Sequence, residues 1–536
     1  MKITRALVSV YDKTGLAEFG AALKKHGVEV VATGGTQTFL EKSGVATVAL
    51  EKVGHFPEML DGRVKTLQPE IFAGILARKS SQDHMNQLSS HGIRPFDMIV
   101  CNFYAFEAAA GRPDVSEKEL IELIDIGGPS LVRASAKNFE SVCVVPSSKF
   151  YPEISSELNS NGGSISFETR KKMALKAFEI VSAYDTAIFN TLSRRMFPDK
   201  AFPDSFYLSS TGFEVPKYGE NPDQKAMIYA INGAKGGIPE WSQLFGDTRS
   251  YNNHLDVASS FEILEGFEDT PAAATVKHGQ ISGFAFSTSL ADAYRLAHAC
   301  DREADFGNTT VFNRTVDLET AKLVGKNEGV DDDSVYTEIV LAPGFQKEAL
   351  EILKAKQKKK MRLVQTTKGS SFPFDVKVIQ GLVLVQDAPD YRRKLDLSRL
   401  TVETKAKPST TDTSILLGLW EIARRVESNA IVVGNGETSP DNPSKLIKLW
   451  TLGVGSFRKR NGATRIALYN AGIRAKDAYC ASDGFFPFPD SVEMLGKAGI
   501  HAIIQPGGSI SDRKVVETSD RYTMPMLFTH ERAFKH

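Results

Sequence analysis

Cysteine is scarce in this chain of 536 residues, which contains only Cys101, Cys143, Cys300 and Cys480 and no CxxC pair. A disulfide framework or a thiolate zinc site needs paired or closely spaced cysteines, so the sequence predicts neither. The histidines are scattered as well, and we expect no catalytic metal. Widely separated cysteines fit a reducing compartment, so we expect a cytoplasmic protein.

The chain also lacks an excess of charge of either sign. Its 65 basic residues balance 65 acidic ones, so no global field would attract nucleic acid or anionic lipid. The main basic cluster, KAKQKKKMR at 354–362, follows the helical pattern KEALEIL and is interpreted as a solvated helix end. We expect neither a nucleic-acid nor a membrane partner, and any anion site must be local.

Long apolar runs are missing too. No stretch of 18 uncharged apolar residues occurs, and the first residues, MKITRALVSV, enter a strand pattern at once, so neither a membrane span nor a signal peptide is predicted. With 42% hydrophobic and 24% charged residues the composition is that of a globular protein. At roughly 100 to 200 residues per domain, the length predicts three or four structural units.

Short apolar runs alternate with helical patterns in the first ~145 residues. Strands are predicted at 6–10, 28–32 and 98–102, and a helix at 16–27. This rhythm is typical of a doubly wound parallel sheet covered by helices, whose functional edge lies at the carboxyl ends of the strands.

The remaining chain has a break and a second α/β region. Apolar spacing at 166–195 predicts one or two helices, and the segment 197–212, interrupted by proline and glycine, predicts a domain boundary. The last region is predicted to be α/β, with parallel architecture favoured over a sandwich. Its strands are expected at 338–343, 381–386 and 429–434, and a helix at 413–426.

A candidate phosphate site follows the second strand. In TGGT, Thr33 precedes Gly34 and Gly35, where the strand turns into a helix whose free amides favour a phosphate. Taken alone, this pattern also fits a plain tight turn. The neighbouring strand end offers further polar groups: Ser9, Lys13 and Thr14.

Four segments extend this pattern over the whole first domain. They are SVYDKTG after the first strand, MLDGRVKTLQPEIFAGILAR (59–78), CNFYAF (101–106) and IDIGGPSLVRASAKN (124–138). In order and spacing they resemble the cyclohydrolase half of the bifunctional AICAR transformylase/IMP cyclohydrolase family. The resemblance implies a methylglyoxal-synthase-like fold.

The implied chemistry is closure of formyl-AICAR to IMP with loss of water. An amide nitrogen is a poor nucleophile, so the reaction needs an oxyanion stabiliser, a proton acceptor and close positioning. The resemblance implies that Lys65 acts on the formyl oxygen, aided by Tyr104, Asp125 and Lys137. Further substrate contacts are expected from Arg63, Thr66, Asn102, Gly127 and Gly128.

The first domain departs from the family pattern in one loop and at one neighbouring position. Gln68, Glu70 and Phe72 stand where the family commonly has His, Lys and His, and Tyr11 stands where a serine commonly follows the first strand. Because the four catalytic candidates remain, we expect cyclisation to persist with altered binding.

Eight blocks around the segment AAATVKHGQISGFAFS (272–287) resemble the transformylase domain of the same family across ~213–536. They include YGENP (218–222), SYNNHLD (250–256), SDGFFPFPD (482–490) and the terminal THERAFKH. The resemblance implies a cytidine-deaminase-like α/β region of two subdomains. The zinc-deaminase signature, HxE with PCxxC, does not occur, so zinc deamination is not predicted.

This second half implies formyl transfer from 10-formyltetrahydrofolate to AICAR. His278 would be the general base, Lys277 would stabilise the oxyanion, and Asn429 would orient the pair. Matching positions for nucleotide or folate contacts are Lys217, Tyr218, Arg460, Phe485, Asp490 and Arg532.

Departures in this half concern the binding pocket. The family's KHxxPxG is KHGQISG, Lys217 replaces an arginine, and the glycine-rich loop before Arg460 is the shorter GVGSFRKR. Another formyl carrier is therefore an open alternative to 10-formyltetrahydrofolate.

The predicted organisation is a cyclohydrolase domain at 1–196, a linker at 197–212 and a transformylase domain at 213–536. Its small-molecule partners would be AICAR, formyl-AICAR, IMP and a folate, and the family implies a homodimer. Three other functions stay open: one activity only, a non-catalytic nucleotide-binding protein, and a methylglyoxal synthase.

Overall fold

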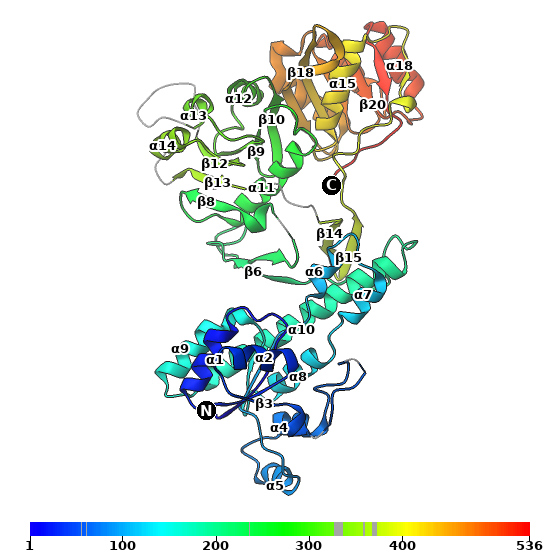
Figure 1. Cartoon of the computed structure of the whole chain (residues 1–536). Helices are drawn as coiled ribbons and strands as arrows, with labels where there is room; N and C mark the ends of the chain where they lie inside the picture. The colour runs from blue at the N-terminus through cyan, green and yellow to red at the C-terminus, as the bar shows by residue number, and fades with distance from the viewer. Residues whose placement is uncertain (55, 61, 235, 326–335, 357–359, 367–371) are drawn as a thin grey trace. The chain divides into compact units, whose positions relative to one another are not determined.

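The computed structural model describes residues 1–54, 56–60, 62–234, 236–325, 336–356, 360–366 and 372–536. It divides into two compact units (Figure 1). Unit 1 comprises Met1–Thr211 and Ile231–Gly233, and unit 2 comprises Gly212–Ala230 and Ala234–His536.

Unit 1 contains a five-stranded parallel sheet in the order β3-β2-β1-β4-β5. Its strands are β1 (Arg5–Ser9), β2 (Glu29–Ala32), β3 (Thr47–Ala49), β4 (Met98–Cys101) and β5 (Cys143–Val145). Every residue of β4 is buried, as the apolar run MIVC requires of a central strand in a covered parallel sheet. The strand order reverses beside β1, which is the position where such sheets open a ligand crevice.

Two groups of helices pack on this sheet. α1 contacts α2 and α9, whereas α8 contacts α4 and α10, as in a doubly wound fold. The helices are α1 (Leu16–Lys25), α2 (Gly34–Lys42), α3 (Glu51–Gly54), α4 (Pro69–Leu76), α5 (Gln82–Ser90), α6 (Phe106–Ala110), α7 (Glu117–Glu122), α8 (Gly127–Lys137), α9 (Tyr151–Ser160) and α10 (Phe167–Met196).

The predicted helical segment at 166–195 is one helix, α10. The Ser166 side chain accepts a hydrogen bond from the Thr169 amide at 3.1 Å and so caps its first turn. After α10, residues 197–209 are all described and contain neither helix nor strand.

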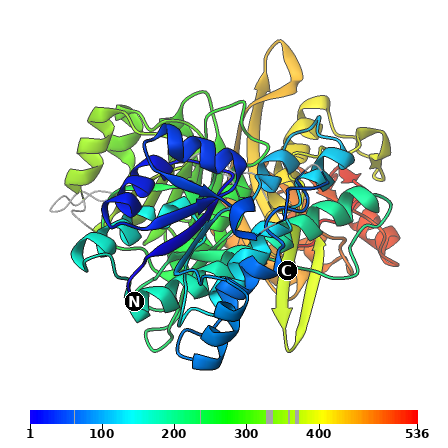
Figure 2. The same ribbon diagram turned by 60° about the horizontal axis from the view of Figure 1, so that its bottom comes forward.

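Unit 2 is built on a twelve-stranded mixed sheet, in the order β16-β21-β20-β19-β17-β18-β10-β9-β11-β12-β13-β8. The strands are β8 (Ser242–Phe245), β9 (Ala272–Lys277), β10 (Gln280–Phe286), β11 (Asn308–Phe312), β12 (Thr337–Ala342), β13 (Arg362–Gln365), β16 (Thr401–Val402), β17 (Ala430–Ser439), β18 (Asn442–Ser456), β19 (Tyr479–Ser482), β20 (Ala502–Gln505) and β21 (Met526–Phe528). β17 and β18 continue into a long hairpin, seen in orange at the top of Figure 2.

The prediction of a parallel architecture for this region is wrong for the middle and for the two edges of the sheet. Pairs are parallel within β11–β12–β13 and β19–β20–β21. They are antiparallel from β11 through β9, β10, β18 and β17 to β19, and at the edge pairs β13–β8 and β16–β21. Only two residues connect β9 to β10, and a connection that short joins antiparallel strands.

The remaining elements complete unit 2 and the chain between the units. The helices are α11 (Tyr251–Leu264), α12 (Leu290–His298), α13 (Leu318–Leu323), α14 (Lys347–Lys356), α15 (Thr410–Ala423), α16 (Arg460–Ala471), α17 (Asp490–Lys497) and α18 (Asp512–Arg521). Two small sheets are formed by β6 (Ser210–Glu214) with β7 (Ile228–Ile231) and by β14 (Phe374–Ile379) with β15 (Leu382–Asp387).

The local predictions correspond to observed elements. The runs at 6–10, 28–32 and 98–102 are β1, β2 and β4, and those at 338–343, 381–386 and 429–434 lie in β12, β15 and β17. The basic cluster at 354–362 begins at the end of α14, as predicted, but Lys356 is not solvated, because it is 7% exposed and its Nζ donates to the Lys322 and Val324 carbonyls at 2.6 and 2.8 Å. Residues 357–359 lie outside the described ranges. All four cysteines are among the described residues and are buried and unpaired. The described helices include none with the length and apolar character to cross a bilayer.

Helix α16 rests directly on strand β18 because the strand has two glycines at the contact. A Cβ at Gly453 would lie 2.0 Å from the Ala467 carbonyl oxygen, and one at Gly455 would lie 2.0 Å from the Ala463 carbonyl oxygen. Both neighbours are backbone atoms, so the helix would have to move to admit a side chain.

We predict that Gly453→Ala lowers the free energy of unfolding of unit 2 by about 1–3 kcal/mol, the usual cost of overpacking a core. Denaturant unfolding measures the change. Gly344→Ala is the control, since its Cβ would meet only the Thr315 side chain, at 3.2 Å or more. Equal stability of the two variants would contradict the close contact between α16 and β18.

Candidate functional site

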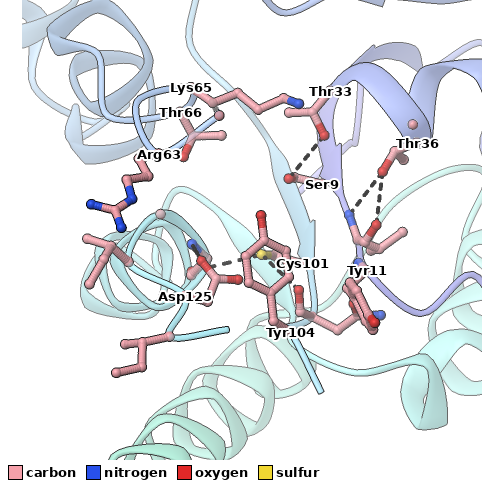
Figure 3. Close-up of a pocket in the computed structure, with 18 of the residues that line it drawn as sticks. Ser9, Tyr11, Thr33, Thr36, Arg63, Lys65, Thr66, Cys101, Tyr104 and Asp125 are labelled. Carbon is pink, nitrogen blue, oxygen red and sulfur yellow. Dashed lines mark hydrogen bonds between the residues drawn. The ribbon is translucent and has the colours of Figure 1, made fainter. Parts of the chain in front are cut away.

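A cavity of about 550 Å³ lies in unit 1 at the carboxyl ends of β1, β2 and β4 (Figure 3). Parallel strands bring residues that are distant in sequence to this one edge. Predicted site residues among its lining are Ser9, Lys13, Thr33, Gly35, Arg63, Lys65, Thr66, Asn102, Tyr104, Asp125, Gly127 and Gly128.

The first wall of the cavity is the start of α2. Thr33 precedes this helix, and its hydroxyl donates to Ser9 Oγ at 3.2 Å rather than capping the helix amides. Thr36 Oγ1 accepts from the Val10 amide at 3.2 Å and donates to the Val10 carbonyl, which joins the helix to β1. The positive end of α2 therefore faces a cavity lined by hydroxyl groups, an arrangement that favours a phosphate.

Lys65 reaches the same end of α2 from the opposite wall. Its side chain extends toward Thr33 in Figure 3, and a Cβ on Gly34 would lie 3.1 Å from its Nζ. Lys65 Nζ also lies 2.8 Å from a Glu58 carboxylate oxygen. Gln68 stabilises the loop that carries Lys65, because its Nε2 donates to the Lys65 carbonyl at 2.7 Å. Gln68, which stands where the family commonly has His, therefore supplies a hydrogen-bond donor to the backbone of the loop.

Asp125 lies at the start of α8. Its Oδ1 accepts a 2.7 Å hydrogen bond from the Gly128 amide, and a Cβ on Gly128 would lie 2.6 Å from its Oδ2. On Gly127, a Cβ would lie 2.5 Å from Thr66 Oγ1. Burial raises the pKa of Asp125, and the hydrogen bonds from backbone amides oppose that shift only in part.

Tyr104 and Tyr11 form the outer part of the cavity. Their rings meet edge to face with centroids 5.5 Å apart, and Tyr104 is 42% exposed, so it is not a core residue. Burial and then the nearby Asp125 raise the Tyr104 pKa, which keeps the phenol protonated and able to donate.

Asn102 fixes the backbone beside Tyr11. Its Oδ1 accepts from the amides of Tyr11 and Asp12 at 2.7 and 3.1 Å, and its Nδ2 donates to the Asp12 carbonyl at 2.8 Å. Lys13 Nζ donates to the Tyr11 carbonyl at 3.1 Å. These bonds hold the SVYDKTG segment at the edge of the cavity.

Three predicted residues lie outside the cavity lining. Lys137 is exposed at the last position of α8, about 15 Å along the helix axis from Gly127 at a rise of ~1.5 Å per residue, so the structure does not bring it to the cavity. The Thr14 hydroxyl donates to Asp12 Oδ1 at 2.7 Å instead. Gly34 is not among the lining residues, but a Cβ on it would lie 3.1 Å from Lys65 Nζ.

In unit 2, Lys277 and His278 lie at the tight turn between β9 and β10. His278 and Gly279 have φ values of 52° and 74°, and positive values at both central residues are those of a type I′ hairpin. Lys277 Nζ donates to the Phe306 carbonyl at 2.6 Å. The Gly279 amide donates to Asp256 Oδ1 at 2.6 Å, which ties the turn to α11.

The hydrogen bonds of the Asn429 side chain go to the loop before α16. Its Nδ2 donates to the carbonyls of Phe457 and Arg458 at 3.3 and 3.2 Å, so it braces the GVGSFRKR segment. Gln280, directly after the turn, is held by Glu427, since its Nε2 donates to Glu427 Oε2 at 3.1 Å.

The structure does not present Arg460 to a phosphate either. Its guanidinium pairs with Asp483, donates to the Ala430 carbonyl at 3.1 Å and is buried to 5% exposure. Asp483 is completely buried, and a buried carboxylate needs such a partner. Arg460 therefore stabilises the packing of α16 against the ends of β17 and β19.

The other predicted residues of unit 2 lie nearer the surface. Asp490 begins α17 and accepts from Asn461 Nδ2 at 2.9 Å, and Phe485 is half-buried. Lys217 is exposed and Tyr218 half-buried in the segment after β6. Arg532 lies over the Phe534 ring at 4.7 Å and lines a cavity of about 1050 Å³ beside the last residues of the chain.

Comparison with known proteins assigns both halves. The family description "AICARFT/IMPCHase bienzyme" matches residues 135–469, and "MGS-like domain" matches residues 15–130. The chain belongs to the AICARFT/IMPCHase bienzyme family. In the described ranges, the family member shows no cluster of three or more His, Cys, Asp or Glu side chains suited to a metal.

Several curated relatives match this bienzyme-family chain over its full length. The "Bifunctional purine biosynthesis protein PurH" of Listeria monocytogenes serotype 4b (strain F2365) is 39% identical over 534 residues, covering 99% of this chain and 100% of its own. That of Caldicellulosiruptor bescii is 39% identical over 537 residues, covering 99% of each chain. A solved chain titled "Crystal structure of ForH" is 30% identical and covers 35% of this chain and 99% of its own, with a TM-score of 0.32.

Some lining residues of the cavity were not predicted. They include Val10, Thr36, Gly62, Cys101, Ile121 and Glu122. Thr36 and Cys101 carry a local signal, since one ends TGGT and the other ends β4. Glu122 lines the cavity because it forms an ion pair with Arg63. That contact joins residues far apart in the sequence, so no local pattern predicts it.

We predict that Asp125→Asn raises the stability of unit 1 at neutral pH. The folded pKa of Asp125 lies above its unfolded value, so the native state of the wild type binds more protons between the two values and loses stability as pH rises through them. Asparagine keeps the Oδ1 acceptor and cannot ionise. Denaturant unfolding at several pH values should show a gain that is absent below the ordinary carboxyl pKa and grows above it. A gain independent of pH would contradict the role of burial.

Proposed function

We propose that this family member transfers a formyl group from 10-formyltetrahydrofolate to AICAR and closes the resulting formyl-AICAR to IMP. The observation that carries the proposal is the unit 1 cavity, in which the start of α2 and Lys65, Tyr104 and Asp125 meet. Relatives named as bifunctional purine biosynthesis proteins over the full length support both activities.

For cyclisation, the nucleotide phosphate would bind at the start of α2, where Ser9, Thr33 and Lys13 surround it. The carboxamide nitrogen then attacks the formyl carbon and a C–N bond forms. The formyl oxygen leaves as water with one proton from that nitrogen and one from the formamide nitrogen, as the ring C=N bond forms. Lys65 stabilises the developing oxyanion once it turns from Glu58 to the substrate. Asp125, whose raised pKa makes it more basic, accepts the nitrogen proton.

For formyl transfer, the 5-amino group of AICAR attacks the formyl carbon of the folate. His278 would accept the proton that this nitrogen loses and return it to the folate nitrogen as the tetrahedral intermediate collapses and the C–N bond to the folate breaks. Lys277 would stabilise the oxyanion of that intermediate. Support comes from the turn between β9 and β10, which places both side chains at one strand end.

The two activities divide along the chain in this proposal. Cyclisation belongs to 1–196 and formyl transfer to 213–536, with 197–212 as the linker, a division supported by the two compact units and by the irregular residues 197–209. A folate-derived formyl donor follows from formyl transfer, and 10-formyltetrahydrofolate is the specific proposal.

A second candidate is cyclisation alone. It is favoured by one observation, namely that Arg460 is paired with buried Asp483 rather than available to a nucleotide. Incubation of the whole protein with AICAR and 10-formyltetrahydrofolate, followed by separate detection of formyl-AICAR and IMP, distinguishes the two. Turnover of added formyl-AICAR without formation of formyl-AICAR from AICAR would establish cyclisation alone.

We predict that one substitution in each unit separates the activities. Lys65→Gln should slow cyclisation by about 10²–10³-fold, because it removes the cation from the oxyanion. His278→Asn should slow formyl transfer at least ~10²-fold, the usual contribution of a general base, while asparagine tolerates the left-handed backbone at this position. The two half-reactions are assayed separately.

His501→Ala is the matched control for the histidine, since His501 pairs with Asp412 at 3.3 Å elsewhere in unit 2. It should leave both rates unchanged. A near-normal formyl transfer rate in His278→Asn would remove His278 from the mechanism.

We also propose that two copies of the chain form a dimer through the β14–β15 hairpin. An isolated two-stranded sheet has only marginal stability in water and needs further packing. Val378 and Val383, which pair across the two strands, nevertheless have side chains that are 78% and 52% exposed. Such an apolar pair on a hairpin suits an interface.

Replacing both valines by lysine should therefore convert a dimer into a monomer in sedimentation, because the charges would be desolvated at the interface. Ile473→Lys is the control, at a single exposed apolar residue on the surface of unit 2. A double variant that remains dimeric would place the interface elsewhere.

A further inference from the structure

The loop between α12 and β11 is mostly exposed but contains one completely buried carboxylate. Arg302 and Glu303 are exposed and Phe306 is 63% exposed, whereas Asp305 has 0% exposure. Burying a carboxylate costs free energy unless neighbouring groups bind it. The groups that contact Asp305 therefore show which parts of the fold this buried carboxylate stabilises.

Asp305 connects α12 to β11. Its Oδ2 lies 2.6 Å from Nδ1 of His298, the last residue of α12, and Tyr294 of the same helix stacks on that ring at 5.6 Å. On the other side, the amide of Asn308, the first residue of β11, donates to the Asp305 carbonyl at 3.2 Å. Burial raises the Asp305 pKa, and the contact with His298 opposes that shift.

The same point adjoins Lys277. Phe306 follows Asp305 directly, and its carbonyl accepts the 2.6 Å hydrogen bond from Lys277 Nζ. Asp305 therefore fixes the loop whose backbone oxygen receives the Lys277 ammonium group.

We propose that Asp305 and His298 are positioning residues for the Lys277 ammonium in formyl transfer. The inference rests on the proposed role of Lys277. A lysine side chain is flexible, and its ammonium has a defined place only where a fixed acceptor holds it. Neither positioning residue needs to touch the substrate, because both act through the Phe306 carbonyl.

Asp305→Ala removes the anchor and tests the proposal in the full chain. The kcat for formyl transfer should fall by about 10–10²-fold, the effect of misplacing a catalytic group by about an ångström, with the KM for AICAR unchanged. Cyclisation of added formyl-AICAR should also be unchanged, since its site lies in unit 1. Asp305→Asn keeps an acceptor for His298 and should retain most of the rate.

A double-mutant cycle separates positioning from a general loss of structure. If Asp305 acts through Lys277, Asp305→Ala should cause no further loss in the Lys277→Gln background. The same fold-loss in both backgrounds would overturn the inference. A wild-type rate in Lys277→Gln alone would instead overturn the proposed role of Lys277.

If Asp305→Ala fails to fold, substitution of its partner His298 tests the same contact. His298→Ala should lower kcat in the same way, whereas His298→Asn, which keeps a nitrogen donor close to the position of Nδ1, should restore it. His501→Ala serves as the control for loss of a paired histidine in the same unit. A normal kcat in His298→Ala would overturn the proposal.

Discussion

The hydrogen bond from the Gly128 amide to the Asp125 carboxylate is the constraint on which the unit 1 cavity depends. It turns the chain into α8 so that Gly127 and Gly128 contact Thr66 and Asp125 with no room for a Cβ on either. The loop that carries Lys65 can then reach across to α2. A methyl group on either glycine would therefore push α8 away from Thr66 or Asp125 and open this side of the cavity.

In unit 2, the residues proposed for formyl transfer, Lys277 and His278, lie at a hairpin turn rather than at the carboxyl ends of parallel strands. A turn has few neighbours of its own, so it must be fixed from outside. Asp256 does this from α11, Glu427 from the segment before β17, and Phe306 from the loop after α12. Each contact involves a backbone group or a long side chain, and together they leave the turn little freedom.

The sequence predicts features that are local and misses those that depend on tertiary partners. Gly34 and Gly35 were predicted at a helix start because strand, glycines and helix are consecutive. Lys137 belongs to the same motif as Gly127 and Gly128, but the helix between them carries it to the far end. Arg460 matched a phosphate-binding position, and only the fold reveals Asp483 against it. The antiparallel centre of the sheet was missed because KHGQ lacks the Asn-Gly or Asp-Gly signal of a hairpin.

The two units also differ in how readily their charges can change partners. Lys65 pairs with Glu58 and Arg63 with Glu122 where the side chains are partly exposed, and such pairs contribute only about 0–1 kcal/mol. In the proposed function, an incoming nucleotide therefore displaces these glutamates at little cost. Arg460 and Asp483 form a buried ion pair, and removing one partner of such a pair costs about 3–5 kcal/mol. Ligand binding can rearrange the charges of unit 1, whereas in unit 2 it must fit charges that folding has already fixed.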